Sequence, residues 1–253
     1  EFATLPKKKS NKHPVERPSG PGQIWHYDIV YGNGRAIGGI HYALFFVDRK
    51  TRHKRIFGLQ DLTEPSIKRA FKTFIRTIGF YPDEIIADRD FKIIGKAADD
   101  IFAPYTQVSG APTGRQSQNG LSEANWRYVC NIARNYLVEH MLPPEFWFFA
   151  IKYAVEVSNY IPIQNPDKTE TTTPFFETYN EPPDLRKLIP LFSPAYVKVY
   201  QSAEGNTFES QTVKAILVGN DDKSDGRLFY NPATRKLLAS SDYRLNISAT
   251  SGS

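Results

Sequence analysis

The sequence predicts an α/β domain followed by a small all-β unit. Three observations support this class. Strand-like segments with short connections occupy residues 24–59, an amphipathic helix and another apolar strand follow to residue 88, and several short alternating segments lie beyond residue 195. At 253 residues and 40% hydrophobic content, the chain can fill a core with its 17 Phe, 14 Tyr and 3 Trp. Disorder of most of the chain is therefore excluded.

Charge and cysteine content narrow the class of protein further. The chain carries 32 Lys and Arg against 27 Asp and Glu, and the resulting charge of +5 favours a polyanionic partner. Residues 1–21 are rich in Lys and Pro, which predicts a basic flexible arm that is either solvated or bound to nucleic acid. A single cysteine excludes a disulfide framework and a multi-thiolate metal site within this chain and favours a reducing compartment. No apolar stretch approaches the roughly 18 residues of a membrane span.

The first three strands are expected at Ile24–Val30, Gly39–Asp48 and Lys54–Leu59. Their connections are too short for a parallel crossover, so they predict an antiparallel meander. The turn at residues 49–55 carries five positive charges in seven residues. It is interpreted either as a solvated hairpin tip or as a phosphate contact, and the sequence favours neither.

An amphipathic helix follows the meander. Thr63 is the expected N-cap, Pro65 lies in the first turn and Gly79 ends the helix, while apolar residues recur at helical spacing: Ile67, Ala70, Phe71, Phe74, Ile75 and Ile78. A short strand from Glu84 to Asp88 comes next. Because a helix separates it from the meander, we expect it to run parallel to the first strand.

The next elements are less regular. We expect a helical turn at Asp99–Phe102, a short strand at Tyr105–Ser109 and a mobile polar loop at residues 110–120. Two helices should follow, one at Leu121–Glu139 and one from Pro143-Pro144 to about Tyr160. Residues 164–189 have the composition of a linker. Residues 190–247 then contain short strands that predict a small β-barrel: Ala195–Tyr200, Val213–Gly219, Arg227–Tyr230 and Lys236–Ala239.

Three acidic residues lie at the ends or edges of these elements. Asp28 is within the first strand, Asp88 ends the fourth, and Glu123 is expected in the first turn of the helix after the polar loop. If the two strands are neighbours, the three carboxylates form a cluster that needs hard divalent cations, Mg²⁺ or Mn²⁺. Two ions in such a site favour phosphoryl transfer. Taken alone, each acid could instead be an ordinary residue of a strand edge, of a turn or of a helix N-terminus, where the helix dipole favours a negative charge. Four other acidic residues nearby are alternative ligands: Asp48, Asp83, Glu84 and Asp90.

The helix that carries Glu123 has a polar face and a buried stripe. Arg127, Asn131 and Arg134 share the face of the glutamate. The stripe consists of Trp126, Val129, Ile132, Ala133 and Tyr136. The polar face is interpreted as a contact for a polynucleotide, or as an ordinary Glu–Arg pair on a solvated surface.

These segments resemble a known family. Residues 111–123, APTGRQSQNGLSE, are similar to the loop and catalytic-glutamate motif of retroviral-type integrases, in the branch of copia-type LTR retrotransposons. Residues 25–29 and 85–91 resemble the family's two aspartate strands, and the 34 residues between Asp88 and Glu123 are close to the family's spacing. Residues 48–52 resemble its D-x-x-S/T-R turn, which implies a structural role for Asp48. The resemblance extends over about residues 22–247.

The resemblance implies a fold and an activity. The fold is a ribonuclease H-like integrase core at residues 22–163, a mixed five-stranded sheet with flanking helices, followed by an SH3-like barrel. The activity is metal-dependent processing of the element's DNA ends and strand transfer of the 3′-hydroxyl into target DNA. Asp28, Asp88 and Glu123 would hold two Mg²⁺ or Mn²⁺ ions. The implied DNA contacts are Arg115, Gln116, Ser117, Gln118, Asn119, Gly120, Arg127, Asn131 and Arg134.

The resemblance also implies partners and places. The partners are the terminal-repeat DNA ends of the element, target DNA and further copies of the chain, in the nucleus during integration and in a cytoplasmic virus-like particle before it. The family's upstream His/Cys zinc module is absent, so we expect a core plus C-terminal part of a polyprotein product. Asp88 is followed by Arg89-Asp90-Phe91, which leaves Asp90 as an alternative ligand. A catalytically inactive module of the same fold and another ribonuclease H-like nuclease are the alternative functions.

Overall fold

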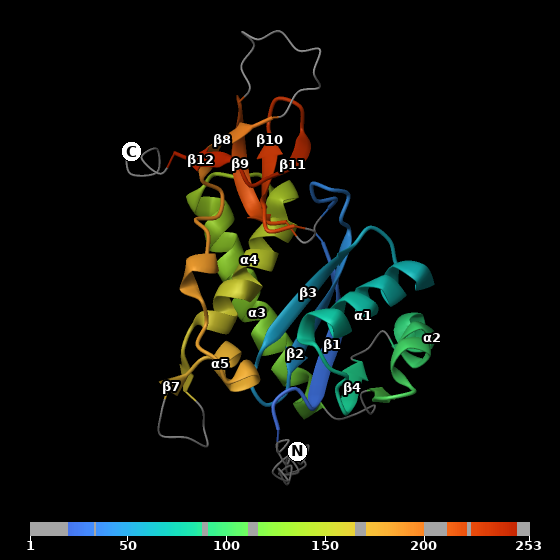
Figure 1. Ribbon diagram of the computed structural model, residues 1–253. Coiled ribbons are helices and arrows are strands. Elements are labelled where there is room, and N and C mark those ends of the chain that lie inside the picture. The colour runs from blue at the N-terminus through green and yellow to red at the C-terminus, as the bar shows by residue number, and fades with distance from the viewer. Residues whose placement is uncertain are drawn as a thin grey trace, which may run out of the picture.

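The computed structural model describes residues 20–32, 34–87, 91–110, 116–164, 171–199, 212–221 and 224–246 (Figure 1). The predicted basic arm therefore lies almost entirely outside the described residues. None of the helices in these ranges combines the length and the apolar character that crossing a membrane requires.

A mixed five-stranded sheet forms the centre of the first unit. Its strands are β1 (Ile24–Tyr31), β2 (Tyr42–Asp48), β3 (Lys54–Leu59), β4 (Glu84–Ala87) and β5 (Gln107–Gly110), in the order β3-β2-β1-β4-β5. The first three strands are antiparallel, β4 runs parallel to β1, and β5 runs parallel to β4. The predicted meander, the parallel fourth strand and the mixed sheet are confirmed.

Helices cover both faces of this sheet (Figure 1). They are α1 (Glu64–Ile78), α2 (Phe91–Phe102), α3 (Gln116–Glu139) and α4 (Trp147–Tyr160), with a 3₁₀ turn at Pro144–Phe146. Successive residues of a strand point to opposite faces, so Tyr27 and Ile29 join the core under α1 and α2, whereas Val30 joins the core under α3 and α4. Asp28 shares the face of Val30 and therefore lies on the α3–α4 side.

Helix α1 follows its predicted pattern closely. The predicted apolar positions from Ile67 to Ile78 are buried except Ile75, which is half-buried, and Gly79 ends the helix with a φ of 84°. This left-handed conformation suits glycine, because a Cβ would be strained there. Thr63 occupies the N-cap position but makes no capping hydrogen bond; its hydroxyl donates to Asp61 Oδ1 instead, at 2.5 Å.

Two helices begin earlier than the sequence suggested. Helix α2 has 12 residues, where only its last turn was predicted. Helix α3 begins at Gln116, so Gln116–Gly120 are helical and the prediction of a mobile loop there was wrong. Each helix contains one glycine, Gly95 in α2 and Gly120 in α3; a helix-interior glycine costs only about 1 kcal/mol, and no proline interrupts either helix. Glu123 therefore lies about two turns into α3 and not in its first turn.

The second unit is a five-stranded antiparallel sheet. Its order is β11-β10-β9-β8-β12, built from β8 (Pro194–Lys198), β9 (Thr212–Asn220), β10 (Arg227–Asn231), β11 (Lys236–Ser240) and β12 (Tyr243–Leu245). The predicted small all-β unit is confirmed, and its SH3-like class stays a prediction.

The segment between the two units is more ordered than its linker composition suggested. It contains the paired strands β6 (Ile163–Gln164) and β7 (Thr171–Thr172), the helix α5 (Pro174–Tyr179) and a 3₁₀ turn at Leu185–Lys187. At its end, the Tyr153 hydroxyl of α4 donates to the carbonyl of buried Ile189 at 2.5 Å. The rings of Phe192 and Tyr230 both contact Phe146, so the second sheet packs against the α3–α4 end and shares its core.

Candidate active site

The register between β1 and β4 positions the first two predicted acids. Tyr27 pairs with Ala87, which is the last residue of β4, and Asp28 follows Tyr27 directly. Asp88 follows Ala87 in the sequence but lies outside the described residues, as does Asp90. The two aspartate strands are thus neighbours, as predicted. The choice between Asp88 and Asp90 stays a prediction.

The helix that carries Glu123 packs on the same face of the sheet as Asp28. Asp28 pairs with Phe45 of β2, and the Phe45 ring contacts the ring of Trp126 at a centroid distance of 5.2 Å. Trp126 lies on α3, three residues after Glu123. Asp28 is half-buried and Glu123 is exposed. The Asp28 carboxylate therefore lies closer to the sheet, and the Glu123 carboxylate lies at the solvent-exposed surface.

The outer face of α3 is polar and accessible. Glu123, Arg127, Asn131 and Arg134 are all exposed, while Val129 on the opposite face is fully buried. Arg134 Nη1 donates to Asn131 Oδ1 at 3.0 Å. The predicted polar face is confirmed, and the predicted stripe packs on the core with Val129 and Ala133 buried and the other three residues, Trp126, Ile132 and Tyr136, half-buried.

The remaining predicted DNA contacts are described in part or not at all. The first turns of α3 contain five of them, Gln116, Ser117, Gln118, Asn119 and Gly120, for which the structure describes the backbone alone. Arg115 lies outside the described residues altogether.

Asp48 is a structural turn residue. It is fully buried, and it accepts hydrogen bonds from the Thr51 amide and hydroxyl, both at 2.7 Å, and from the Gly22 amide at 3.2 Å. Burial raises the pKa of its carboxyl, and the Thr51 hydrogen bonds oppose that rise in part. Two other rivals, Asp83 and Glu84, lie at the start of β4, whereas Asp28 lies beside its end.

The basic turn at residues 49–55 is not a solvated tip, because none of its residues is exposed, and its contact with phosphate stays a prediction. His53 and Lys54 are buried, and Asn159 of α4 clamps the Lys54 backbone through bonds of 2.8 Å to its amide and 2.9 Å to its carbonyl. Burial, together with the charge of Arg52, lowers the pKa of Lys54 to about 8. Arg55 donates to the Tyr179 hydroxyl at 2.8 Å. Both sequence interpretations missed this packing, because it depends on α4 and α5.

His26 is a buried polar residue that the sequence did not single out. It lies two residues before Asp28 on the same face, and its Nε2 has no hydrogen-bond partner among the described residues. Burial, with the charges of Arg49 and Arg52, lowers its pKa to about 4. The imidazole is therefore neutral at neutral pH.

The predicted metal ligands are only partly among the described residues. Among the described residues, no three His, Cys, Asp or Glu side chains form a metal-binding group. The predicted trio includes Asp88, so the described part contains only Asp28 and Glu123. Carboxylate oxygens on these two elements are the ligand type that Mg²⁺ and Mn²⁺ prefer.

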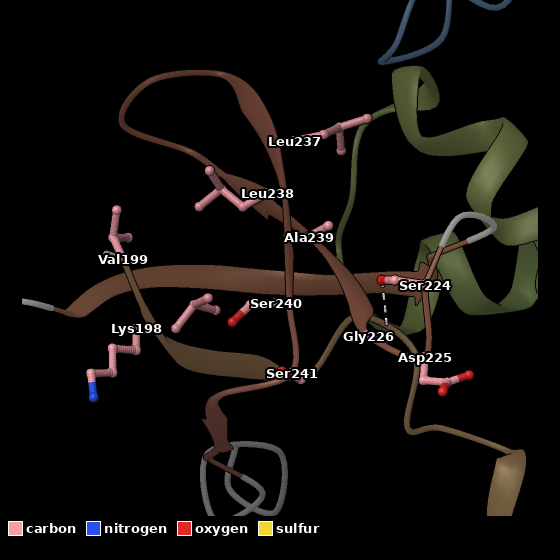
Figure 2. A pocket seen from close by; sticks show the side chains of 11 residues that line it. Lys198, Val199, Ser224, Asp225, Gly226, Leu237, Leu238, Ala239, Ser240 and Ser241 are labelled. Atoms are coloured by element: carbon pink, nitrogen blue, oxygen red, sulfur yellow. Dashed lines mark hydrogen bonds between the residues drawn. The ribbon is translucent and has the colours of Figure 1, made fainter. Parts of the chain in front are cut away.

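A hollow of about 670 Å³ lies in the second sheet, away from these acids (Figure 2). Lys198 and Val199 line one side, Ser224–Gly226 another, and β11 with Ser241 crosses between them. None of the predicted site residues lines this hollow, so it does not bear on the acid cluster.

The chain was compared with known protein families, with known protein sequences and with solved structures. No model of a known protein family matches the chain. The sequence is 24% identical over 196 residues to the retrovirus-related Pol polyprotein from transposon RE2 of Arabidopsis thaliana. The match covers 71% of this chain and 12% of the polyprotein, so the chain spans about one eighth of that relative.

Solved structures with a similar fold include a retroviral integrase core and a chain of a retroviral intasome complex. The HTLV-2 integrase catalytic core domain in complex with magnesium, in its trimeric form, matches with a TM-score of 0.50 and 20% identity, over 64% of this chain and 100% of that chain. An intasome of simian T-cell lymphotropic virus in complex with the PP2A regulatory subunit B56 gamma matches with a TM-score of 0.51 and 13% identity, over 91% of this chain and 81% of that one. These matches confirm the integrase-core fold. The polyprotein match adds sequence similarity to a retrovirus-related Pol polyprotein.

Proposed function

We propose that the chain is the integrase part of a retrotransposon Pol polyprotein, of the copia type. It would process the ends of the element's DNA and transfer each freed 3′-hydroxyl into target DNA. The observation that carries the proposal is the packing of Asp28, through Phe45 and Trp126, against the helix of Glu123, beside the end of β4. This packing supports the proposal because it puts the strand of Asp28 and the helix of Glu123, two of the three acids that the proposed reaction needs, on one face of the sheet.

Asp28, Asp88 and Glu123 would hold two divalent ions, Mg²⁺ or Mn²⁺. When bound, the ions would supply an activated nucleophile and stabilise the leaving oxyanion. The donor set fits such ions because all three side chains offer carboxylate oxygens. The magnesium named with the HTLV-2 core gives further support. The half-buried position of Asp28 fixes one ligand on a strand, where rigid backbone holds it in place.

The outer face of α3 would position the DNA. Arg127 is exposed one helical turn beyond Glu123, and Arg134 is exposed about 16 Å beyond it along the helix axis, so their guanidinium groups can contact successive phosphates of the DNA backbone. Asn131 accepts from Arg134 and thereby orients it. Such contacts to the backbone do not read sequence, so we expect low target specificity. Further copies of the chain, terminal-repeat ends and target DNA are the proposed partners, with the nucleus as the place of reaction.

A strand-transfer assay tests the proposal. Terminal-repeat oligonucleotides are incubated with the protein and Mg²⁺ or Mn²⁺, and joined products are separated on a gel. Wild type should give product, and Glu123→Gln should give at least a hundredfold less. Glu139→Gln is the matched control, because Glu139 is an exposed glutamate of the same helix. Equal product from Glu123→Gln and wild type would sink the assignment. DNA binding without product in wild type would favour the inactive module instead.

A further inference from the structure

An exposed aromatic surface lies at the end of the first sheet where β4 and β5 begin. It consists of four exposed residues, which are Phe80, Tyr81, Pro104 and Tyr105. We call it the Tyr105 surface, because the exposed fraction is largest at Tyr105, at 69%. Exposed apolar residues gathered in this way mark a contact surface. Since β4 ends at Ala87, beside Asp28, the surface at its start lies at the other end of the strand from the proposed acids.

The fold holds the Tyr105 surface in place. The rings of Tyr81 and Tyr105 contact each other, with their centroids 4.6 Å apart. The Thr106 hydroxyl donates to the Pro82 carbonyl at 2.7 Å and thereby joins the two segments that carry these rings. The surface is thus formed before any ligand binds, so a ligand does not have to order it.

The N-terminal arm joins the described structure next to this surface. A Cβ on Gly22 would lie 2.4 Å from Phe80 Cζ, so the Phe80 ring rests on the backbone of Gly22. The described residues begin two positions earlier, at Gly20. The arm is therefore tethered beside the Tyr105 surface. A short tether gives an effective concentration in the millimolar range, so a contact with a dissociation constant of about 0.1 mM would be about 90% formed.

The arm has the composition of a ligand for exposed aromatic rings. Residues 5–18 contain three prolines, at positions 6, 14 and 18. Segments rich in proline favour the extended polyproline II conformation, and they dock on aromatic side chains at a low cost in conformational entropy. The rings of the Tyr105 surface offer such a contact.

The arm and the surface also carry opposite charges. Residues 5–18 contain five Lys and Arg and a single acid. Residues 80–84 and 99–107, which build the surface, contain four acids and no Lys or Arg. Asp100 pairs with Lys68 of α1 at 2.5 Å, and Asp83 and Asp99 are exposed. Single pairs of exposed charges contribute little to binding, but together they favour this surface over others for a basic segment.

We infer that residues 5–18 dock on the Tyr105 surface of the same chain, with prolines against the aromatic rings and lysines beside Asp83 and Asp99. The arm is then an intramolecular ligand. Its positive charges are held at the end of the sheet away from the acids and not on the DNA bound there. The inference goes beyond the proposed function and does not depend on it.

Cross-linking of the whole protein tests the contact. A carbodiimide, which joins lysine amines to neighbouring carboxylates, is added to a mixture of unlabelled and nitrogen-15-labelled chains. The linked peptides are identified by mass spectrometry. We expect links from the lysines of the arm to Asp83 or Asp99, each within a chain of one isotope.

Limited proteolysis measures how much of the docking depends on the rings. Trypsin cleavage after Lys9 and Lys12 is followed over time by mass spectrometry. Tyr105→Ala should weaken docking about tenfold and therefore make this cleavage roughly fivefold faster. Tyr196→Ala is the matched control, because Tyr196 is an exposed tyrosine of β8 in the second sheet, and it should be cleaved like wild type. Circular dichroism of both variants verifies that they are folded.

Several outcomes would overturn the inference. Equal cleavage of wild type and Tyr105→Ala would show that the arm does not dock on the rings. Links between chains of different isotopes would show that the surface receives the arm of a second copy. Protection of the arm that appears only after DNA is added would make the arm a nucleic-acid contact. None of these outcomes bears on strand transfer, which is measured separately.

Discussion

The two faces of the first sheet are built differently. The face under α1 and α2 is closed by large aromatic residues such as Trp25, Phe71 and Phe74, which are fully buried. The face under α3 and α4 also has an apolar core, but it includes Asp28, the buried His26 and an open apolar groove between the end of β1, α3 and α4. A single strand, β1, supplies both faces through alternate residues. Packing on one side therefore holds in place the polar groups that the other side displays.

The largest effect is expected on the closed face. Phe74→Ala should lower the free energy of unfolding by about 3–5 kcal/mol, because the removed ring is fully buried and stacks on Phe46 at 4.0 Å. Urea denaturation followed by circular dichroism measures the change. Tyr105→Ala, at an exposed aromatic residue, should change it by less than about 0.5 kcal/mol. Similar losses in the two variants would contradict the importance of this face.

The next effect tests a polar clamp on the α3–α4 face. Asn159→Ala should cost about 2–4 kcal/mol, because it leaves the buried amide and carbonyl of Lys54 without their partner. The same denaturation experiment measures it. Asn135→Ala, at an exposed position of α3, is the control and should be nearly neutral. If Asn159→Ala leaves the free energy of unfolding unchanged, the hydrogen bonds from α4 do not stabilise the basic turn.

The difference between the faces also explains what could be read from the sequence. The position of Asp28 next to the fourth strand followed from local patterns, because strand alternation and the short connections restrict the topology. The helical state of Gln116–Gly120 did not follow, since polar residues and one glycine resemble a loop when their neighbours are unknown.

Features assembled from distant segments were also beyond the sequence. His53 and Lys54 lie in a charged run that resembles a solvated turn, and only contacts from α4 and α5 show that they are buried. The apolar groove at the end of β1 is also lined by Trp147 of α4, which is more than a hundred residues away in the sequence. The spacing of apolar residues in a strand or helix shows which residues share a face of that one element. It does not show which distant elements will pack together, so it cannot predict a site that they form jointly.

A smaller effect is expected from pH. Burial, with the charges of Arg55 and Lys54, holds the pKa of His53 well below its usual value, and the pKa of His26 is lowered to about 4. Below pH 6.5 the unfolded chain therefore binds more protons at these positions than the folded one. Stability should fall as pH decreases from 6.5, by up to about 1.4 kcal/mol per pH unit for each histidine.

His53→Leu should remove about half of this slope, and denaturation at pH 7.0, 6.0 and 5.0 measures it. The leucine is expected to be tolerated at neutral pH, because His53 lies among the rings of Trp25, Phe175 and Tyr179. An unchanged slope would mean that His53 is already protonated in the folded protein.

The smallest effect on stability is expected at the proposed catalytic glutamate. Glu123→Gln should change the free energy of unfolding by less than about 0.5 kcal/mol, because the side chain is exposed and the amide has the same shape. Ions that bind only the folded state raise its apparent stability, by about 2.7 kcal/mol at a hundred times the dissociation constant. Added Mg²⁺ or Mn²⁺ should therefore raise the melting temperature of wild type and of Glu139→Gln, and raise that of Glu123→Gln much less. Equal stabilisation of all three proteins by the metal would show that the ions bind away from Glu123. The face under α3 and α4 would then lack the metal-binding role that distinguishes it from the face under α1 and α2.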